Sequence, residues 1–350
     1  MTTPPASTPT AVVTGASSGI GAAAARLLAD RGYRVYATAR RADRLAALAR
    51  GSSADPRTPG ITAVSADLVD DAGLVALVQR VADETGRLDV LVNNAGYGAY
   101  GALEDVPLEE GRAQFEVNLF APARLVQLAL PLMRRRGAGR IINVSSIGGK
   151  VYEPLGGWYH STKFALEGLS DVLRLELAQH GVQVSVVQPG AVATEWGDGA
   201  VETLLRNSRG TPYASQAAGV ARVLGLTARD PGRATSPDEV AAVIVAAATS
   251  RRPKPRYVVG AGARPLLLLR RWLPDRAFDR LMLRLFRPEP PAAAAAALRP
   301  AGGARRAHRP AWQDPALQDP TWQDAAWQEL PGLWQACRFP GRSAARRLVP

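Results

Sequence analysis

Tyr159 and Lys163 are the two residues whose types and spacing point most directly to chemistry. They stand four apart at the start of a long helical pattern, which places both side chains on one helix face. A phenol has an ordinary pKa of about 10 and exchanges protons poorly at neutral pH. A neighbouring ammonium stabilises the phenolate and lowers the pKa of the phenol. The pair therefore predicts a tyrosine that moves protons, although two such residues also meet by accident on helix surfaces.

A glycine-rich turn lies far upstream of this pair. It follows a short apolar run, Ala11–Val13, reads Thr14-Gly-Ala-Ser-Ser-Gly-Ile-Gly21, and leads into an alanine-rich helical pattern. Glycines let the backbone approach a pyrophosphate, and the N-terminus of the helix supplies amide donors. An ordinary tight turn is the alternative. The order of strand, turn and helix favours a nucleotide-binding fold.

Composition bounds the class of protein. The chain has 350 residues, of which 47% are hydrophobic, and its single cysteine, Cys337, excludes an internal disulfide. No apolar run approaches the roughly 18 residues of a membrane-spanning helix. Residues 1–9 lack the apolar core of a signal peptide. We therefore expect a cytoplasmic protein in a reducing compartment.

The net charge of +12 is concentrated in one segment. Residues 1–250 hold 24 basic and 24 acidic side chains, whereas residues 251–310 hold 15 basic and three acidic ones. A strongly basic chain can indicate nucleic-acid binding. Here the arginines of the basic segment alternate with leucines and offer no stacking platform for bases. We therefore expect no nucleic-acid partner.

Apolar strand candidates alternate with helical patterns along the chain. This alternation predicts a single doubly wound, Rossmann-like α/β domain with a seven-stranded parallel sheet. The expected strands are Ala11–Thr14, Arg34–Thr38, Ile61–Ser65, Leu88–Asn93, Arg140–Ser145, Gln183–Gln188 and Tyr257–Gly260. The expected helices are Ile20–Arg31, Arg44–Arg50, Ala72–Thr85, Leu108–Arg136, Tyr159–His180 and Pro237–Thr249. We expect Ala193–Ala218 to be a long irregular loop that covers a ligand.

The motifs together resemble the short-chain dehydrogenase/reductase family over about residues 8–260. The resemblance is carried, in the order of that family, by the turn Thr14–Gly21, Asn93-Asn-Ala-Gly96, Asn118, Ser146, Tyr159-x-x-x-Lys163 and Pro189-Gly190. It implies hydride transfer between a nicotinamide and a carbonyl or alcohol. The helix that begins at Tyr159 is also similar to that of hydroxysteroid and retinol dehydrogenases.

The resemblance implies a role for each of four catalytic residues. Tyr159 would act as general acid and base, and Lys163 would hold down its pKa and bond the nicotinamide ribose. Ser146 would orient the substrate oxygen, and Asn118 would hold a water that relays protons to Lys163. As alternatives, Ser146 is a strand-ending hydroxyl that satisfies local backbone, and Asn118 is a buried amide with backbone partners.

The end of the second strand indicates the cofactor. An NAD site places an acid there, against the ribose hydroxyl. This chain has Arg40 instead, and a guanidinium suits the 2′-phosphate of NADP. The alternative is that Arg40 and Arg41 are solvated residues opening a surface helix. By the resemblance, the cofactor contacts would be Gly15, Ser17, Ser18, Gly19, Ile20, Gly21, Arg40, Asp67, Asn94, Gly96, Tyr159, Lys163, Pro189, Gly190 and Thr194.

The expected substrate pocket is mostly apolar or aromatic, which favours a lipophilic alcohol or ketone such as a steroid, retinoid or fatty compound. Its candidate lining is Gly98–Tyr100, Ile147–Leu155, Trp158 and Trp196. We expect His160 on the helix surface and His180 at the helix end, and no metal site. A nucleotide-binding regulator on the same fold is the alternative function, but it would not need a tuned phenol.

Four segments organise the chain: a flexible start (1–9), a catalytic domain (10–262), a basic helical extension (263–287) and a low-complexity, disordered tail (288–350). The extension predicts two short amphipathic helices broken near Pro274. These helices would cap the pocket, pair subunits or lie on an anionic membrane. Members of the family are often homo-oligomers, so we expect one here.

Overall fold

The computed structural model describes residues 8–51, 60–229, 234–260 and 262–290, and only the backbone of residues 226–229. The chain divides into two units, Met1–Gly302 and Gly303–Pro350. All of the described residues belong to the first unit.

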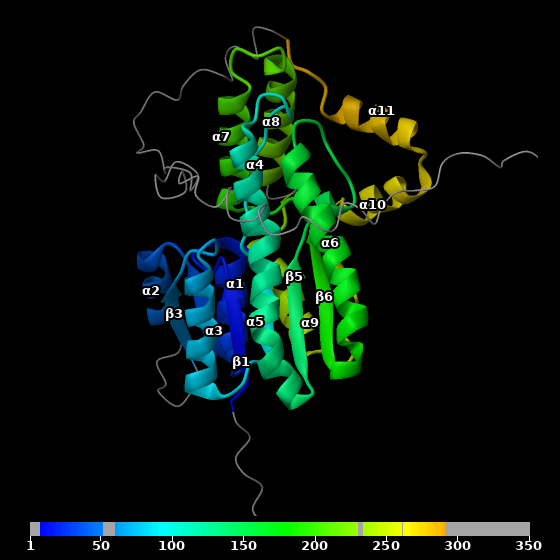
Figure 1. Cartoon of the computed structure of the whole chain (residues 1–350). Helices are drawn as coiled ribbons and strands as arrows, with labels where there is room; N and C mark the ends of the chain where they lie inside the picture. Colours follow the sequence, from blue (N-terminus) through cyan, green and yellow to red (C-terminus); the bar gives the residue numbers. More distant parts are fainter. Residues whose placement is uncertain (1–7, 52–59, 230–233, 261, 291–350) are drawn as a thin grey trace, which may run out of the picture. The chain divides into compact units, whose positions relative to one another are not determined.

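Seven parallel strands form one sheet in the order β3-β2-β1-β4-β5-β6-β7 (Figure 1). The chain starts near the middle, runs to one edge and returns to build the other, as the predicted doubly wound sheet requires. All five residues of β1 are buried, as expected for a strand covered on both faces. The strands are Thr10–Thr14 (β1), Arg34–Ala39 (β2), Ile61–Ser65 (β3), Val90–Asn93 (β4), Gly139–Val144 (β5), Val182–Pro189 (β6) and Arg256–Val259 (β7).

Helices cover both faces of this sheet. On one face α1, α2 and α9 pack mainly alanine, valine and leucine side chains, and on the other α3, α5 and α6 pack larger leucine and valine side chains. Figure 1 shows α3 and α5 in front of the sheet and α1 and α9 behind it. These helices are Gly19–Asp30 (α1), Ala42–Arg50 (α2), Asp71–Thr85 (α3), Ala121–Arg136 (α5), Gly157–Leu177 (α6) and Pro237–Thr249 (α9).

The single helix expected over Leu108–Arg136 is interrupted. It consists of α4 (Leu108–Phe115), one π-helical turn (Glu116–Phe120) and α5. The wider turn has a cause at its centre: the side chain of Asn118 is buried and bonded to the backbone of Tyr97. Such π-turns often occur at functional sites. Side-chain periodicity alone does not reveal them.

The prediction of an irregular loop over Ala193–Ala218 is wrong. The segment instead forms α7 (Glu195–Asn207) and the start of α8 (Ala214–Arg229). Several glycines there lower helix propensity, but Ala200 and Leu204 are fully buried in a third apolar cluster. Burial outweighs the intrinsic cost of about 1 kcal/mol per glycine.

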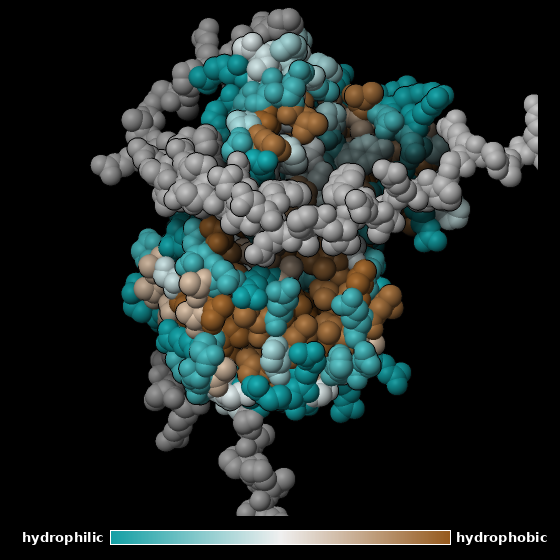
Figure 2. Space-filling view, in the orientation of Figure 1, coloured by the Kyte–Doolittle hydropathy of each residue, from teal (hydrophilic) through white to brown (hydrophobic). Residues whose placement is uncertain are grey.

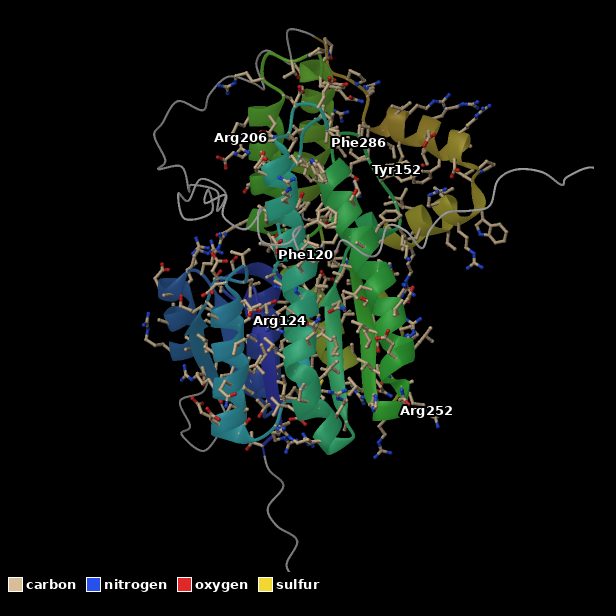
Figure 3. The ribbon with its side chains drawn as sticks, viewed as in Figure 1. Phe120, Arg124, Tyr152, Arg206, Arg252 and Phe286 are labelled. Atoms are coloured by element: carbon tan, nitrogen blue, oxygen red, sulfur yellow. The ribbon has the colours of Figure 1, made fainter. Side chains whose placement is uncertain are left out.

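The two helices predicted after residue 262 are confirmed as α10 (Ala263–Trp272) and α11 (Asp275–Leu285), with the break at Pro274. Phe278 and Met282 of α11 are buried in the same apolar cluster as Tyr159. Figure 3 shows Tyr152 and Phe286 beyond the ends of the strands, close to α11. None of the described helices is long and apolar enough to cross a membrane.

The first residues of the expected disordered tail are described, and they are bonded to α8. The backbone N–H of Glu289 donates to the carbonyl of Ser215 at 3.0 Å, and its carboxylate pairs with Arg222 at 2.5 Å. Residues 291–350 of that tail lie outside the described residues.

Candidate active site

The glycine turn joins β1 to α1 and has the backbone of a phosphate cradle. Gly15 and Gly19 have φ of +66° and +54°, which favours glycine. A Cβ on Gly21 would lie 2.4 Å from the carbonyl oxygen of Gly15, so no side chain fits there. Ser18, the N-cap of α1, makes no side-chain hydrogen bond to the helix. The amides at this end of α1 are therefore placed to receive an anion.

Asn94 braces this turn from the end of β4. Its side-chain amide donates to the carbonyl of Thr14 at 2.9 Å, and its backbone N–H donates to the Thr14 hydroxyl at 3.0 Å. Gly96, two residues on, lies beside the catalytic helix, because a Cβ there would be 3.6 Å from Nζ of Lys163. The Asn93–Gly96 motif thus connects the phosphate turn with the proposed catalytic lysine.

The Lys163 ammonium is buried and donates a hydrogen bond to the carbonyl of Val144 at 3.0 Å. Burial lowers the pKa of Lys163 to about 8, and the Glu167 carboxylate acts in the opposite direction. The lysine therefore sits at the end of β5, one helical turn beyond Tyr159, as the spacing predicts.

The lowered pKa of Lys163 predicts how the free energy of unfolding changes with pH. Between about pH 8 and pH 10.5 the unfolded chain binds more protons at this lysine than the folded protein, so the free energy of unfolding rises with pH. Without cofactor, Lys163→Met should stabilise the protein at pH 7 by up to about 3 kcal/mol. The gain should shrink as the pH approaches 10, in urea titrations at both pH values. Lys254→Met, at an exposed lysine, is the control, and an equal gain at both pH values contradicts the assignment.

The phenol of Tyr159 is also buried, with 7% of the residue exposed. Burial raises its pKa well above 10, a hydrogen bond with Ser146 lowers it, and the Glu153 carboxylate raises it. The expectation that Lys163 lowers this pKa is therefore not met in the protein alone. The ammonium is bonded to the backbone of β5, and desolvation dominates the environment of the phenol.

Ser146 follows β5 and caps a short 3₁₀ turn. Its hydroxyl accepts from the N–H of Gly148 at 3.0 Å and donates to the carbonyl of Pro189 at 3.4 Å. The backbone partners named as the alternative are thus present, and Ser146 reaches Tyr159 as well. The local bonds fix the serine hydroxyl beside the phenol.

Asn118 is almost fully buried in the π-turn. Its amide donates to the carbonyl of Tyr97 at 2.9 Å and to the hydroxyl of Thr162 at 3.1 Å, and its carbonyl accepts from the Tyr97 N–H at 3.1 Å. These are the backbone partners of the alternative reading. Asn118 therefore joins the β4 loop to the catalytic helix, and its part in a proton relay stays a prediction.

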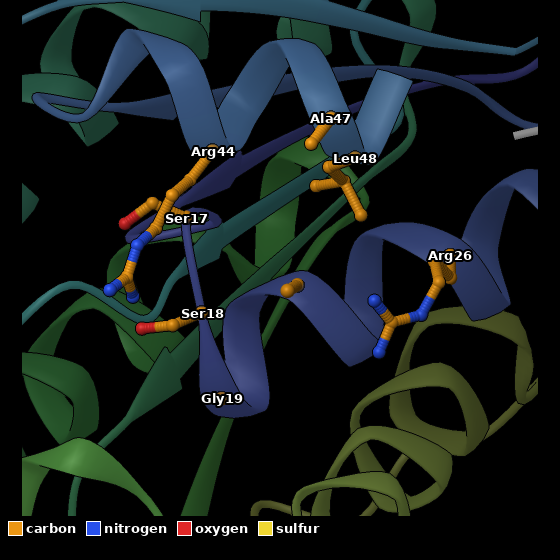
Figure 4. A pocket seen from close by; sticks show the side chains of 8 residues that line it. Ser17, Ser18, Gly19, Arg26, Arg44, Ala47 and Leu48 are labelled. Carbon is orange, nitrogen blue, oxygen red and sulfur yellow. The ribbon is translucent and has the colours of Figure 1, made fainter. Parts of the chain in front are cut away.

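Arginines after β2 surround the serines of the glycine turn. Arg41 donates to the hydroxyls of Ser17 at 2.9 Å and Ser18 at 2.8 Å. Arg44 lines a pocket of about 420 Å³ over the same turn, and Figure 4 shows it reaching towards Ser17 with Arg26 on the far side. Arg40 is exposed; burial raises the pKa of Tyr97, and the charge of Arg40 acts against this rise. Arg41 and Arg44 were not among the contacts expected from the sequence, and the contact of Arg40 with the 2′-phosphate stays a prediction.

The remaining expected cofactor contacts are found around the same edge of the sheet. Asp67 follows β3, and its carboxylate accepts a hydrogen bond from the N–H of Val69 at 3.2 Å. Pro189 is the last residue of β6. Thr194 is the N-cap of α7 and lies against the glycine turn, since a Cβ on Gly19 would be 3.0 Å from its methyl group. Ile20 packs against the apolar cluster of α1, and Gly190 donates to Val259 at 2.9 Å.

A buried polar cluster stands next to the phenol of Tyr159. Tyr100 donates to Glu153 at 2.7 Å, and His160 pairs with the same carboxylate at 3.2 Å. His160 is 6% exposed, so its expected place on the helix surface is wrong. The Glu153 carboxylate raises the pKa of His160 against the effect of burial. A charged partner in the preceding loop was the signal that sequence reasoning missed.

Aromatic rings pack around Tyr159, where the substrate pocket is expected. The ring of Trp196 lies 5.0 Å from that of Tyr159, and the ring of Tyr100 lies 5.7 Å from it. Trp158, expected in this wall, instead packs against Phe115 of α4 with ring centres 6.2 Å apart. It precedes Tyr159 by one residue, so the helix turns it to another side.

Comparison with known proteins agrees with this geometry. Residues 9–204 match the short chain dehydrogenase family. A probable short-chain type dehydrogenase/reductase, VdlC of Helicobacter pylori, is 37% identical over 77% of this chain and 95% of its own. A 3-ketodihydrosphingosine reductase of Bacteroides thetaiotaomicron is 32% identical over 79% of this chain and 96% of its own.

A solved structure of a metagenomic short-chain oxidoreductase in complex with NADP is 33% identical, with a TM-score of 0.56. The similarity covers 72% of this chain and 97% of that one. The fold, the glycine turn and the Tyr159–Lys163 helix therefore have one explanation: the chain belongs to the short-chain dehydrogenase family and is an NAD(P)-dependent oxidoreductase.

Proposed function

We propose that this protein transfers hydride between NADP(H) and a lipophilic alcohol or ketone, with Tyr159 as general acid and base. The observation that carries the proposal is the position of the phenol. It is buried beside the Ser146 hydroxyl and one turn before a buried lysine. A bound NADPH would supply the hydride.

The chain's own residues would manage the proton. Ser146 orients the substrate oxygen, and Tyr159 donates its proton to that oxygen during reduction. Burial raises the pKa of Tyr159, so the phenol is protonated at neutral pH but is a weak acid in the protein alone. Its role as proton donor therefore requires that the bound cofactor and substrate bring this pKa down. Asn118 keeps the β4 loop and the catalytic helix in register through its bonds to Tyr97 and Thr162.

The preference for NADP rests on the arginines. Arg41 and Arg44 gather at the Ser17–Ser18 turn, and the second strand ends without an acid. Guanidinium groups bind phosphate with paired, charge-assisted hydrogen bonds. The complex of the metagenomic relative with NADP is consistent with this choice.

A lipophilic substrate is favoured by the surroundings of Tyr159. The apolar cluster around it includes Val151, Leu204, Phe278 and Met282. The name of the Bacteroides relative denotes a reductase of a long-chain ketone, which fits the same chemical class. The test is NADPH oxidation, followed by absorbance, with a series of ketones of increasing chain length. Activity confined to small polar aldehydes would contradict the proposal.

We also propose a cytoplasmic homo-oligomer that pairs through α5 and α6. Three large apolar side chains of α6 are exposed, Phe164, Val172 and Leu175, and so is Phe120 at the end of the π-turn that leads into α5. Figure 2 shows a brown, hydrophobic area over this part of the molecule. Covering such an area with a second copy removes apolar surface from water.

The C-terminal helices are proposed to close the substrate pocket and to touch anionic membranes. Phe278 and Met282 face the cluster of Tyr159, whereas Leu268 and Trp272 are exposed among arginines. Both acids of α11 have partners, because Asp275 pairs with Arg270 and Asp279 accepts from Tyr152. The outer face is therefore cationic and partly apolar, as in interfacial helices.

The membrane contact predicts sedimentation with vesicles. We expect the protein to sediment with vesicles that contain phosphatidylserine and to remain in solution with phosphatidylcholine alone. Exchanging Leu268 and Trp272 for glutamate should reduce the bound fraction several-fold. The control is the same exchange at the exposed Leu103. Equal sedimentation of both variants rejects the contact.

A further inference from the structure

Glu195, the first residue of α7, connects that helix to the arginines that follow β2. Its carboxylate pairs with Arg41 at 2.9 Å and with Arg44 at 2.6 Å. The hydrogen bonds of the two guanidinium groups lower the pKa of Glu195, so it is anionic at neutral pH. The carboxylate is 55% exposed, and each pair therefore contributes little to stability by itself.

The same arginines carry the proposed phosphate contact. While Arg41 pairs with Glu195, it also donates to the hydroxyls of Ser17 and Ser18, the serines of the glycine turn. Arg44 lines the pocket over that turn. A carboxylate thus already satisfies two cations at the place where a phosphate of the cofactor is expected. An anion that arrives there must share or replace this partner.

The residues on either side of Glu195 connect the glycine turn with the surroundings of Tyr159. Its neighbour Thr194 lies against Gly19, and its neighbour Trp196 packs on the ring of Tyr159. Further along α7, the Thr203 hydroxyl accepts from the N–H of Tyr100 at 3.2 Å, and Asn207 donates to its carbonyl at 2.9 Å. The ion pairs therefore hold the start of a helix whose other residues form the wall of the substrate pocket.

We propose that Glu195 is a specificity-determining residue that competes with the 2′-phosphate of the cofactor for Arg41 and Arg44. Binding of the phosphate releases the start of α7 from these arginines. A dinucleotide without that phosphate leaves the ion pairs in place. The inference rests on the proposed use of NADP, and it adds an internal competitor and a link to α7.

The first test measures cofactor affinity without any turnover. Titration calorimetry with NADPH and NADH compares the wild type with Glu195→Gln. Loss of the competing charge should tighten NADPH binding about threefold to tenfold, the range for two exposed ion pairs, and leave NADH binding unchanged. Glu202→Gln, at an exposed acid of the same helix, is the control and should change neither affinity.

The second test follows α7 itself by hydrogen exchange of its amides over residues 195–207. Adenosine 2′,5′-bisphosphate should speed exchange in the first turn of α7 of the wild type, whereas adenosine 5′-monophosphate should not. Glu195→Gln should exchange fast in this turn without any ligand. Equal exchange in all of these samples overturns the release of α7.

The outcomes separate this inference from the proposed function. If the wild type binds NADPH no more tightly than NADH, both the NADP assignment and the inference fall. If it prefers NADPH but Glu195→Gln leaves that affinity unchanged or weakens it, only the competition falls.

Discussion

Replacing Tyr159 by phenylalanine should reduce turnover about 10²–10⁴-fold, which is the usual contribution of a positioned proton donor. The affinity for NADPH should stay nearly unchanged. The exchange removes one hydroxyl and keeps the ring that packs against Tyr100 and Trp196. Ser146 keeps its bonds to Gly148 and Pro189, so the loop should hold its shape. Steady-state rates with saturating NADPH, beside calorimetric titration of the cofactor, measure both effects.

A matched control is available on β7. The phenol of Tyr257 accepts a hydrogen bond from the N–H of Lys254, outside the proposed site. Tyr257→Phe should therefore keep most of the turnover. Retained turnover in Tyr159→Phe would remove this residue from the mechanism, and equal losses in both variants would indicate damage to the fold instead of loss of the proton donor.

Arg41→Asp should raise the KM for NADPH about 10–150-fold and change the KM for NADH little. Loss of a hydrogen bond to a charged group costs about 1.5–3 kcal/mol, which corresponds to this range. Arg41 is the residue that reaches both serines of the glycine turn, so its guanidinium is placed to bind the phosphate. Initial rates over a range of each cofactor give the two ratios.

Arg40→Asp is the natural comparison, because the sequence argument assigned the phosphate to Arg40. Arg40 is exposed, and its charge opposes the rise in the pKa of Tyr97. We therefore expect Arg40→Asp to change the KM for NADPH less than Arg41→Asp does. A larger effect at Arg40 would restore the assignment from the sequence. Equal losses for NADPH and NADH in both variants would reject a phosphate site at these arginines.

The centre of the sheet could be predicted from the sequence because strands such as β1 and β4 are buried on both faces and consist mainly of valine, leucine and alanine. The glycine turn and the Tyr159–Lys163 pair were predictable for a related reason: each consists of neighbours in the sequence. Gly21 illustrates this only in part, since the crowding that excludes a side chain comes from Gly15 in the same turn and from the Asn94 amide of a distant segment.

What the sequence did not reveal depends on contacts between distant segments. The π-turn at Asn118 is explained by the backbone of Tyr97, and Leu204 of α7 is buried in an apolar cluster with residues from other segments. The bonds of Arg41 to Ser17 and Ser18 likewise join segments that are distant in the sequence. Periodicity within one segment carries no information on such partners.

Because α11 packs against the cluster of Tyr159, residues around the phenol and residues proposed for catalysis come from different segments of the chain. Phe278 and Met282 pack around the phenol from a segment that follows the last strand, while Tyr159 and Lys163, which we propose to move protons, belong to α6. Mutations that accumulate after residue 262 can therefore retune which molecules are accepted without disturbing the reaction. In an enzyme built in this way, changes in the reaction and changes in substrate specificity arise from different parts of the gene.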